Sequence, residues 1–122
     1  MTAAAGATGG VLGRTPVPVT ETEWQQTVVD LAHVLGWTVA HFRPARTAQG
    51  WRTPVAADGA GFVDLVLARD RVLFVELKSE TGRLTQPQRE WLIRLRAAGA
   101  EVHVWRPSDF DTAKHTLTRR TP

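Results

Sequence analysis

Three charged residues interrupt two apolar segments near the middle of the chain. The segments span residues 62–68 and 72–77, and the charged residues are Asp64, Glu76 and Lys78. Because side chains alternate along a strand, Glu76 and Lys78 share one face if the second segment is extended. In an antiparallel hairpin whose connection has odd length, such as residues 69–71, Asp64 lies opposite Glu76 on that face. A two-residue turn would put the two carboxylates on opposite faces, and the site would fail.

Two carboxylates that lie this close repel each other, and burial adds to the cost unless a cation sits between them. Mg²⁺ is the natural candidate because it prefers hard oxygen ligands and commonly binds through one or two carboxylates plus substrate phosphate. Lys78 could orient a water, lower its pKa or offset charge that grows on a phosphate, which suits phosphodiester hydrolysis. The alternative is structural: Asp64 ends a strand, and Glu76 and Lys78 form an ion pair without catalysis.

A helix over residues 20–35 is predicted to bring a third carboxylate toward these residues. Thr20 and Glu23 have the spacing of a capping box, in which the hydroxyl and the carboxylate satisfy each other's backbone donors. The apolar stripe of this helix consists of Trp24, Val28, Leu31 and Leu35. One turn before Trp24 the stripe reaches Glu21, which we expect to face the interior. A shift of the helix start by two residues would exchange Glu21 and Glu23.

The segment before Asp64 is predicted to be a long basic loop. Residues 37–42 alternate well enough for a strand, but residues 43–61 lose all periodicity and contain several Pro and Gly residues. Loops of this length in a compact domain are usually functional or disordered. The basic residues of this loop are Arg43, Arg46 and Arg52. Trp51 lies among them, where an exposed aromatic ring could stack on an unpaired base or simply anchor the loop.

The remaining elements complete an α/β arrangement. Residues 62–68 and 72–77 are predicted to form a hairpin covered on both faces. Thr85 caps a second helix that ends at Gly99, residues 100–105 form another strand, and Ser108 caps a last short helix. The order is helix, three strands, helix, strand, helix. It predicts an α/β fold with a mixed central sheet flanked by helices.

Composition limits the kinds of site that the chain can hold. Its 122 residues fit one domain, and the absence of cysteine excludes disulfide frameworks, zinc ribbons, thiol nucleophiles and iron–sulfur sites. Without Cys or clustered His, a metal must bind through oxygen, which favours Mg²⁺ or Mn²⁺ over Zn²⁺. The net charge of +3 and the preponderance of Arg make nucleic acid a plausible partner.

The sequence divides into three parts. Residues 1–19 are rich in Ala, Gly, Thr and Pro and are predicted to be a flexible leader without the features of a signal peptide. Residues 20–117 form the domain, and residues 118–122 form a short basic tail that we expect to stay mobile. No apolar run approaches the length that spans a membrane, so no membrane partner is expected.

The motifs resemble the VRR-NUC branch of the PD-(D/E)XK nucleases over residues 20–109. The matching residues are Gly61-Phe62-Val63-Asp64, Val75-Glu76-Leu77-Lys78, Gly82-Arg83-Leu84-Thr85 with Gln88, and Thr20-Glu21 with Trp24-Gln25 and Gly36-Trp37. One departure is Val63, which stands where the superfamily motif has Pro. That position sets backbone shape and carries no chemistry.

The resemblance implies a restriction-endonuclease-like core around Mg²⁺ or Mn²⁺. Metal ligands would be Asp64, Glu76, Glu21 and the backbone carbonyl of Leu77. Lys78 would assist the attacking water, Gln88 would support the site, and His41 would touch a phosphate or help to position the water. The full set of expected nucleic-acid contacts is His41, Arg43, Arg46, Trp51, Arg52 and Arg83.

The expected function is a metal-dependent DNA endonuclease that is selective for branched DNA such as Holliday junctions or flaps. Two symmetric cuts in a junction need two sites, so a homodimer is expected. The resemblance also implies a cytoplasmic protein, bacterial or phage-encoded. One rival hypothesis is a non-catalytic nucleic-acid-binding or docking module. Loss of the Asp, Glu or Lys would have indicated such a module, but all three residues are present. Another is a small interaction protein with structural carboxylates. Phosphate contacts alone do not specify the DNA structure.

Overall fold

The computed structural model of the chain describes residues 18–43, 45–48, 50–52 and 55–122. The predicted leader therefore lies outside the described residues except for its last two positions, which are exposed. Within the described chain, no helix is long and apolar enough to cross a membrane. The elements are α1 (Glu21–Val34), β1 (Thr38–His41), β2 (Ala45–Thr47), β3 (Gly50–Arg52), β4 (Leu65–Ala68), β5 (Val72–Leu77), α2 (Gln86–Ala97), β6 (Glu101–Trp105), the 3₁₀ helix η2 (Pro107–Asp109) and α3 (Phe110–Thr118).

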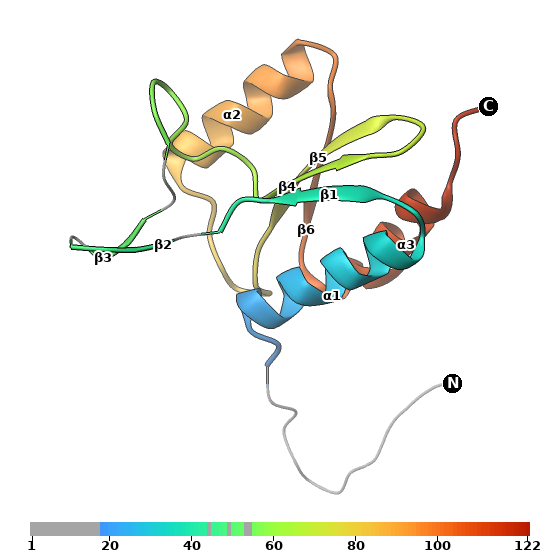
Figure 1. Cartoon of the computed structure of the whole chain (residues 1–122), viewed down its shortest axis with the longest axis horizontal. Coiled ribbons are helices and arrows are strands. Elements are labelled where there is room, and N and C mark those ends of the chain that lie inside the picture. Colours follow the sequence, from blue (N-terminus) through green and yellow to red (C-terminus); the bar gives the residue numbers. More distant parts are fainter. Residues whose placement is uncertain (1–17, 44, 49, 53–54) are drawn as a thin grey trace, which may run out of the picture.

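A mixed sheet of four strands forms the centre of the domain. The strand order is β1-β4-β5-β6, in which β1, β4 and β5 pair antiparallel and β6 pairs parallel to β5. Helix α2 lies on one side of the sheet, and α1 and α3 lie on the other (Figure 1). This arrangement confirms the predicted α/β fold class and the restriction-endonuclease-like order of helices and strands.

Local capping signals determine where α1 begins. The Thr20 hydroxyl accepts a hydrogen bond from the Glu23 amide at 3.1 Å, and the Glu23 carboxylate accepts one from the Thr20 amide at 3.0 Å. This capping box confirms that Glu23 caps the helix. The buried face differs in part from the predicted stripe. Val29 and Ala32 are buried, whereas Leu31 and Leu35 are only partly buried, because the helix is rotated slightly toward the sheet.

The main core lies between the sheet and the α1–α3 layer. Alternate residues of β4 and β5 point into it and are fully buried: Leu65, Leu67, Leu73, Val75 and Leu77. They pack against Trp24, Val28 and Ala32 of α1 and against Ala113 and Leu117 of α3. Burial of one such Leu side chain contributes about 1.5–3 kcal/mol, so these contacts hold the helices on the sheet.

The opposite face of the hairpin is less covered than predicted. On this face Val66 and Phe74 are half-buried and Val72 keeps 47% of its surface accessible, while Glu76 near the end of β5 is buried. Helix α2 covers only part of this face, through Leu92 and an edge-to-face contact between Trp91 and Phe62. Strand β4 also begins at Leu65, later than the start of the apolar segment.

The predicted loop before Asp64 contains a second small sheet. Strands β2 and β3 pair antiparallel, with Arg46 opposite Trp51, and this hairpin projects away from the main sheet (Figure 1). Residues 44, 49, 53 and 54 lie outside the described residues. The prediction of a structureless loop was wrong because strands of three residues are too short to show a periodicity in sequence.

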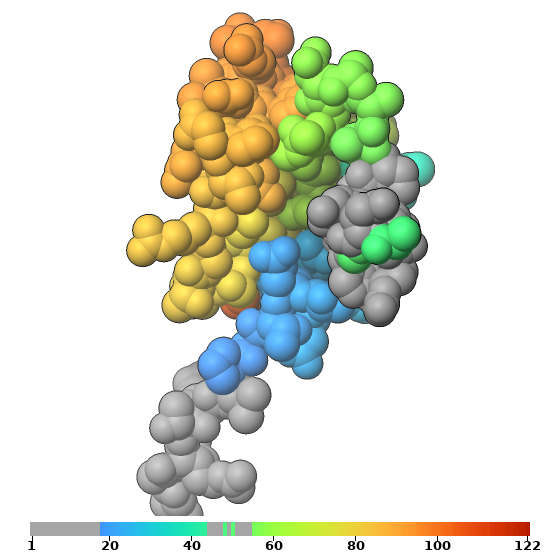
Figure 2. Space-filling model, turned by 90° about the vertical axis from the view of Figure 1, so that its left-hand side faces the viewer, coloured from blue at the N-terminus to red at the C-terminus, as the bar shows by residue number. Residues whose placement is uncertain are grey.

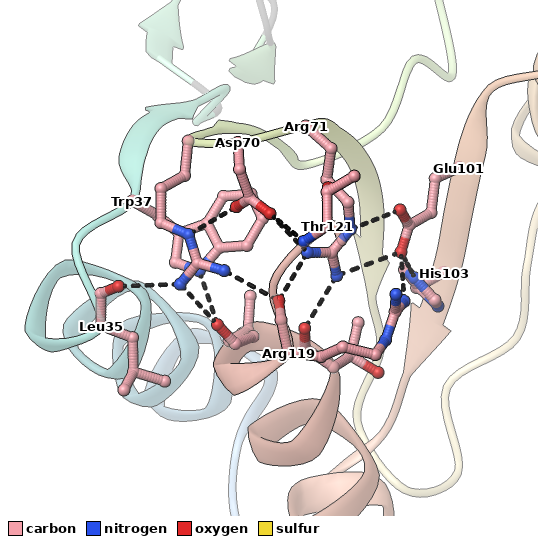
Figure 3. Close-up of polar contacts among 11 residues, drawn as sticks. Leu35, Trp37, Asp70, Arg71, Glu101, His103, Arg119 and Thr121 are labelled. Atoms are coloured by element: carbon pink, nitrogen blue, oxygen red, sulfur yellow. Dashed lines mark hydrogen bonds and ion pairs between the residues drawn. The ribbon is translucent and has the colours of Figure 1, made fainter.

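The turn between β4 and β5 forms hydrogen bonds to the ends of two helices. Arg69 Nη1 donates to the carbonyls of Leu35 and Leu117, each at 3.0 Å, and the Arg69 guanidinium stacks on the Trp37 ring at 4.3 Å. Arg71 Nη2 donates to the Thr116 carbonyl at 2.8 Å. These contacts, shown in Figure 3, tie α1, α3 and the hairpin together at one end of the sheet.

The same turn also binds the predicted basic tail. The Arg119 carbonyl accepts hydrogen bonds from Arg69 and Arg71, and the Thr121 amide donates to Asp70 (Figure 3). The backbone of this tail thus satisfies donors and acceptors of the turn. The prediction for Ser108 was wrong: its amide and hydroxyl bind the Glu80 carboxylate, and α3 begins after η2.

Candidate metal centre

The hairpin register brings Asp64 opposite Glu76. The residue numbers of each pair between β4 and β5 have a constant sum, as for Leu65 and Val75, because the turn between the strands has three residues. The same register, continued by one residue, places Asp64 opposite Glu76. The Phe42 amide donates to the Asp64 carbonyl at 2.9 Å, which extends the β1–β4 pairing to this position. The Asp64 side chain accepts a hydrogen bond from the Leu77 amide at 2.8 Å. The odd-length connection predicted from sequence is therefore confirmed.

Glu76 is a deeply buried carboxylate with one ion-pair partner. It is 1% exposed, and neither carboxylate oxygen has a hydrogen-bond partner among the described residues. Lys78 Nζ lies 3.9 Å from Oε2, which makes an ion pair but is too long for a hydrogen bond. An ionised carboxylate in such surroundings carries a penalty of several kcal/mol, and the residues present fit a cation that would remove it.

When no cation is bound, the surroundings of Asp64 and Glu76 favour the protonated form of their carboxyl groups. Burial and, after it, the charge of Asp64 raise the pKa of Glu76 to about 8, against the charge of Lys78, which lowers it. Burial also raises the pKa of Asp64 to about 6, against the Leu77 amide hydrogen bond, which lowers it. Close like-charged carboxylates behave in this way because one proton or one cation must separate them.

Glu21 lies beside the carboxylate pair. It is half-buried in the first turn of α1, and its charge raises the pKa of both Asp64 and Glu76. Among the residues that the structure describes, no three carboxylate or imidazole groups are close enough together to hold one ion. The structure thus brings Asp64 and Glu76 together and leaves Glu21 adjacent to them.

The backbone of Leu77 and the side chain of Lys78 complete the immediate surroundings. In an antiparallel ladder the N–H and C=O of one residue face the same neighbouring strand, so the Leu77 carbonyl lies on the side of Asp64. Lys78 is 8% exposed, and its ion pair with Glu76 confirms that the two side chains share a face. A group of carboxylate and carbonyl oxygens beside one ammonium group has the chemistry to hold a hard divalent cation and a phosphate.

Gln88 has a local structural role at the start of α2. Its side-chain oxygen accepts a hydrogen bond from the Thr85 amide at 2.8 Å, in the capping box that starts α2. The start of α2 touches the segment that leads to Asp64 through Gly61, which has φ +82°. A Cβ atom at Gly61 would lie 2.6 Å from Pro87 Cβ and 2.9 Å from the Gln88 amide nitrogen. The backbone of Gly61 is thus packed directly on α2.

The predicted DNA contacts fall into two groups. His41 is half-buried and pairs with Leu65, next to Asp64, and its Nε2 has no hydrogen-bond partner in the described part of the chain. Burial and the charge of Arg43 lower the pKa of His41. Arg43 and Arg83 are exposed. The other predicted contacts lie on the β2–β3 hairpin, where only the backbone is described: Arg46, Trp51 and Arg52.

Several segments surround one face of the molecule. Figure 2 shows the start of α1 in blue, the segment after Lys78 in yellow, α2 in orange and the loop before Asp64 in green on this face. Arg106, which the sequence did not single out as functional, holds the yellow segment. Its Nη1 donates to the carbonyls of Ser79 and Gly82, each at 2.6 Å. No local signal in the sequence indicates this contact, because its partners lie far away along the chain.

Comparisons with known proteins indicate the family and the fold of the chain. The model of the VRR-NUC domain family matches residues 19–109. A solved structure described as a VRR_NUC domain protein is similar with a TM-score of 0.59 and 22% sequence identity, over 83% of this chain and 87% of that chain. At that identity the similarity concerns the fold. Among curated proteins, none matches the chain.

Proposed function

The chain belongs to the VRR-NUC domain family, whose domains are nuclease-like, and on that premise we propose that it is a metal-dependent DNA endonuclease. The observation that carries the proposal is the buried carboxylate of Glu76, which faces Asp64 and has no hydrogen-bond partner among the described residues. A divalent cation would join the two carboxylates. Without a cation, the pair would have to hold a proton or keep the desolvation penalty of an ionised buried carboxylate.

Each residue of the site has a distinct expected task. Asp64, Glu76 and the Leu77 carbonyl would hold Mg²⁺ or Mn²⁺. The bound ion supplies Lewis acidity, which lowers the pKa of a water and neutralises charge on the scissile phosphate. Lys78 orients that water and offsets negative charge on the phosphate oxygens during attack. Glu21, outside the pair, accepts a hydrogen bond from a water in the site.

DNA is the proposed substrate, and the surroundings of the site support it. Exposed Arg43 follows Phe42, whose amide donates to the Asp64 carbonyl, and exposed Arg83 follows Lys78 closely in sequence. The β2–β3 hairpin carries two further arginines. We propose that these residues, with His41, bind the phosphate backbone on both sides of the cut. As in the family, the expected products carry a 5′-phosphate and a 3′-hydroxyl. By resemblance, the expected setting is the cytoplasm of a bacterium, with the gene carried by the host or by a phage.

Selectivity for branched DNA and a homodimer form part of the proposal. One small domain covers little of a four-way junction, and symmetric cutting needs two sites related by a two-fold axis. Sedimentation of the protein with a junction should therefore give two protein chains per junction. A complex with one chain per junction that still cuts both strands would contradict the homodimer.

The decisive experiment is cleavage of a labelled panel of junction, flap, splayed-arm and duplex DNAs with Mg²⁺ or Mn²⁺. Asp64→Asn and Glu76→Gln should each reduce cleavage by about 10²–10³-fold or more, the loss typical when a group that stabilises transition-state charge is removed. Glu90→Gln is the matched control, because Glu90 is an exposed acid on α2. It should cut like wild type.

The panel also separates the alternatives. Equal cutting of every DNA would exclude structure selectivity, and cleavage by Glu76→Gln at the wild-type rate would exclude this site. Binding of DNA without any cleavage by the wild-type protein would support a docking module. Calorimetric titration with Mn²⁺ identifies a purely structural pair, because such a protein would bind the ion no better than Asp64→Asn does.

A further inference from the structure

One buried carbonyl oxygen joins two elements that carry the site. The Trp105 carbonyl accepts a hydrogen bond from the indole Nε1 of Trp24 at 3.0 Å and another from the Lys78 amide at 3.1 Å. Trp24 and Lys78, which supply the donors, are 3% and 8% exposed, and Trp105 is 2% exposed, so water does not replace either donor. Helix α1 and the end of β5 are therefore fixed to the same atom.

This hydrogen bond lies one helical turn from Glu21. Residues three apart are neighbours on a helix surface, so the position of Trp24 determines where the Glu21 side chain starts. The capping box around Thr20 is local to α1 and does not tie the helix to the sheet. Apolar packing of Trp24 is less directional than a hydrogen bond, whose length is restricted to about 2.7–3.2 Å.

We propose that Trp24 is a positioning residue, whose indole hydrogen bond to the Trp105 carbonyl sets the distance between the Glu21 carboxylate and the Asp64–Glu76 pair. The inference rests on the proposed function, because that distance matters for an ion and a water held at the pair. It gives Trp24 a task beyond filling the core. A residue with only a packing role would affect stability and leave the site unchanged.

The chain contains a matched control for this distinction. Trp37 is also 3% exposed, and its indole Nε1 donates to the Leu117 carbonyl at 2.9 Å. It packs in the same core but lies beyond the C-terminal end of α1, at the end of the sheet that the Arg69 turn holds. Trp24→Phe and Trp37→Phe each keep an aromatic ring and remove one indole N–H.

The first measurement is Mn²⁺ affinity by calorimetry, with thermal unfolding of the metal-free proteins beside it. Both variants should lower the melting temperature by similar amounts. Only Trp24→Phe should weaken Mn²⁺ binding, by about 10-fold, as changes that reorient groups around a metal do. An equal loss of affinity in Trp37→Phe, or unchanged affinity in Trp24→Phe, would overturn the inference.

A double-mutant cycle tests whether Trp24 acts through Glu21. If it does, the variant with both Trp24→Phe and Glu21→Gln should bind Mn²⁺ as weakly as Glu21→Gln alone. Independent losses that add in the double variant would contradict this route.

Backbone amide exchange in the metal-free protein separates failure of this inference from failure of the proposed function. Loss of the indole bond should speed exchange in the first turn of α1 by about 10-fold in Trp24→Phe relative to Trp37→Phe, because local opening becomes easier. If wild type binds no Mn²⁺, the proposed function fails, and the exchange result still decides whether Trp24 fixes the start of α1. Equal exchange in the two variants would reject the positioning role.

Discussion

At Glu76, burial and the neighbouring Asp64 act in the same direction, because both disfavour a charged carboxylate. The alternation of side chains and the odd-length turn were enough to predict that the two residues meet. The depth of burial was not predictable from the same pattern. It depends on α1 and α2, which lie on opposite sides of the sheet and come from different parts of the chain.

The raised pKa of Glu76 predicts an inverse dependence of stability on pH in the metal-free protein. A carboxyl whose pKa is higher in the folded state binds its proton more tightly there, so stability falls as pH rises from the ordinary carboxyl value near 4 to about 8. Thermal unfolding measured in EDTA from about pH 5 to about 8.5 covers most of this pH range. The melting temperature should fall as the pH rises.

Two controls define this prediction. Glu76→Gln should flatten the dependence, whereas Glu90→Gln, on the exposed face of α2, should keep the wild-type slope. Saturating Mn²⁺ should stabilise wild type most at the high end of the range, because the ion then replaces the proton. A slope that is the same in wild type and in Glu76→Gln would assign it to other groups.

At the scale of elements, the sequence predicted those features that depend on interactions between residues close together in the chain. Thr20 and Thr85 begin α1 and α2 by capping boxes whose members lie three residues apart, so the sequence alone contained both partners. The β2–β3 hairpin and the binding of the tail were not predictable. The Thr121 amide and Asp70 are 51 residues apart in sequence, and no periodicity connects them.

The contact between Gly61 and α2 gives a prediction for Gly61→Ala. The positive φ alone should cost about 1–2 kcal/mol, and the clash of the new Cβ with Pro87 should add about 1–3 kcal/mol. Because Gly61 leads to Asp64, cleavage by the folded fraction should also fall. Chemical denaturation and single-turnover cleavage measure the two effects.

Gly99→Ala is the control for this substitution. Gly99 has φ +89°, and within the described chain a Cβ there would meet no atom within 4 Å. It should therefore show the backbone cost alone and leave cleavage unchanged. Equal destabilisation by the two substitutions would show that α2 moves away from Gly61 without cost.

At the scale of the whole molecule, the site and the Arg69 turn occupy opposite ends of β5. Arg71 precedes the strand and Glu76 lies near its end, about 17 Å away at about 3.3 Å per residue. The turn binds the ends of α1 and α3, and the site lies where α1 and α2 begin. Stability and chemistry therefore depend on different residues.

Arg69→Met tests this separation. The substitution leaves the Leu35 carbonyl without the Arg69 donor, removes one of the two side-chain donors of the Leu117 carbonyl and removes the stack on Trp37, so the free energy of unfolding should fall by about 2–3 kcal/mol. Mn²⁺ affinity at a temperature where the variant stays folded should equal that of wild type. Arg96→Met, on the exposed surface of α2, should change neither quantity. Weaker Mn²⁺ binding in Arg69→Met would show that the two ends are coupled.

The division along β5 also has a consequence for how such a domain can change over generations. If the proposed function holds, residues around Asp64, Arg83 and the β2–β3 hairpin can be replaced to suit a new DNA without loosening the Arg69 turn, which already holds the helices and the tail. A lineage with that function could therefore explore new substrates from a stable starting point. For protein engineering, libraries confined to the end of β5 that carries the proposed site should retain a high proportion of folded variants, and additions that displace residues 119–121 should reduce it.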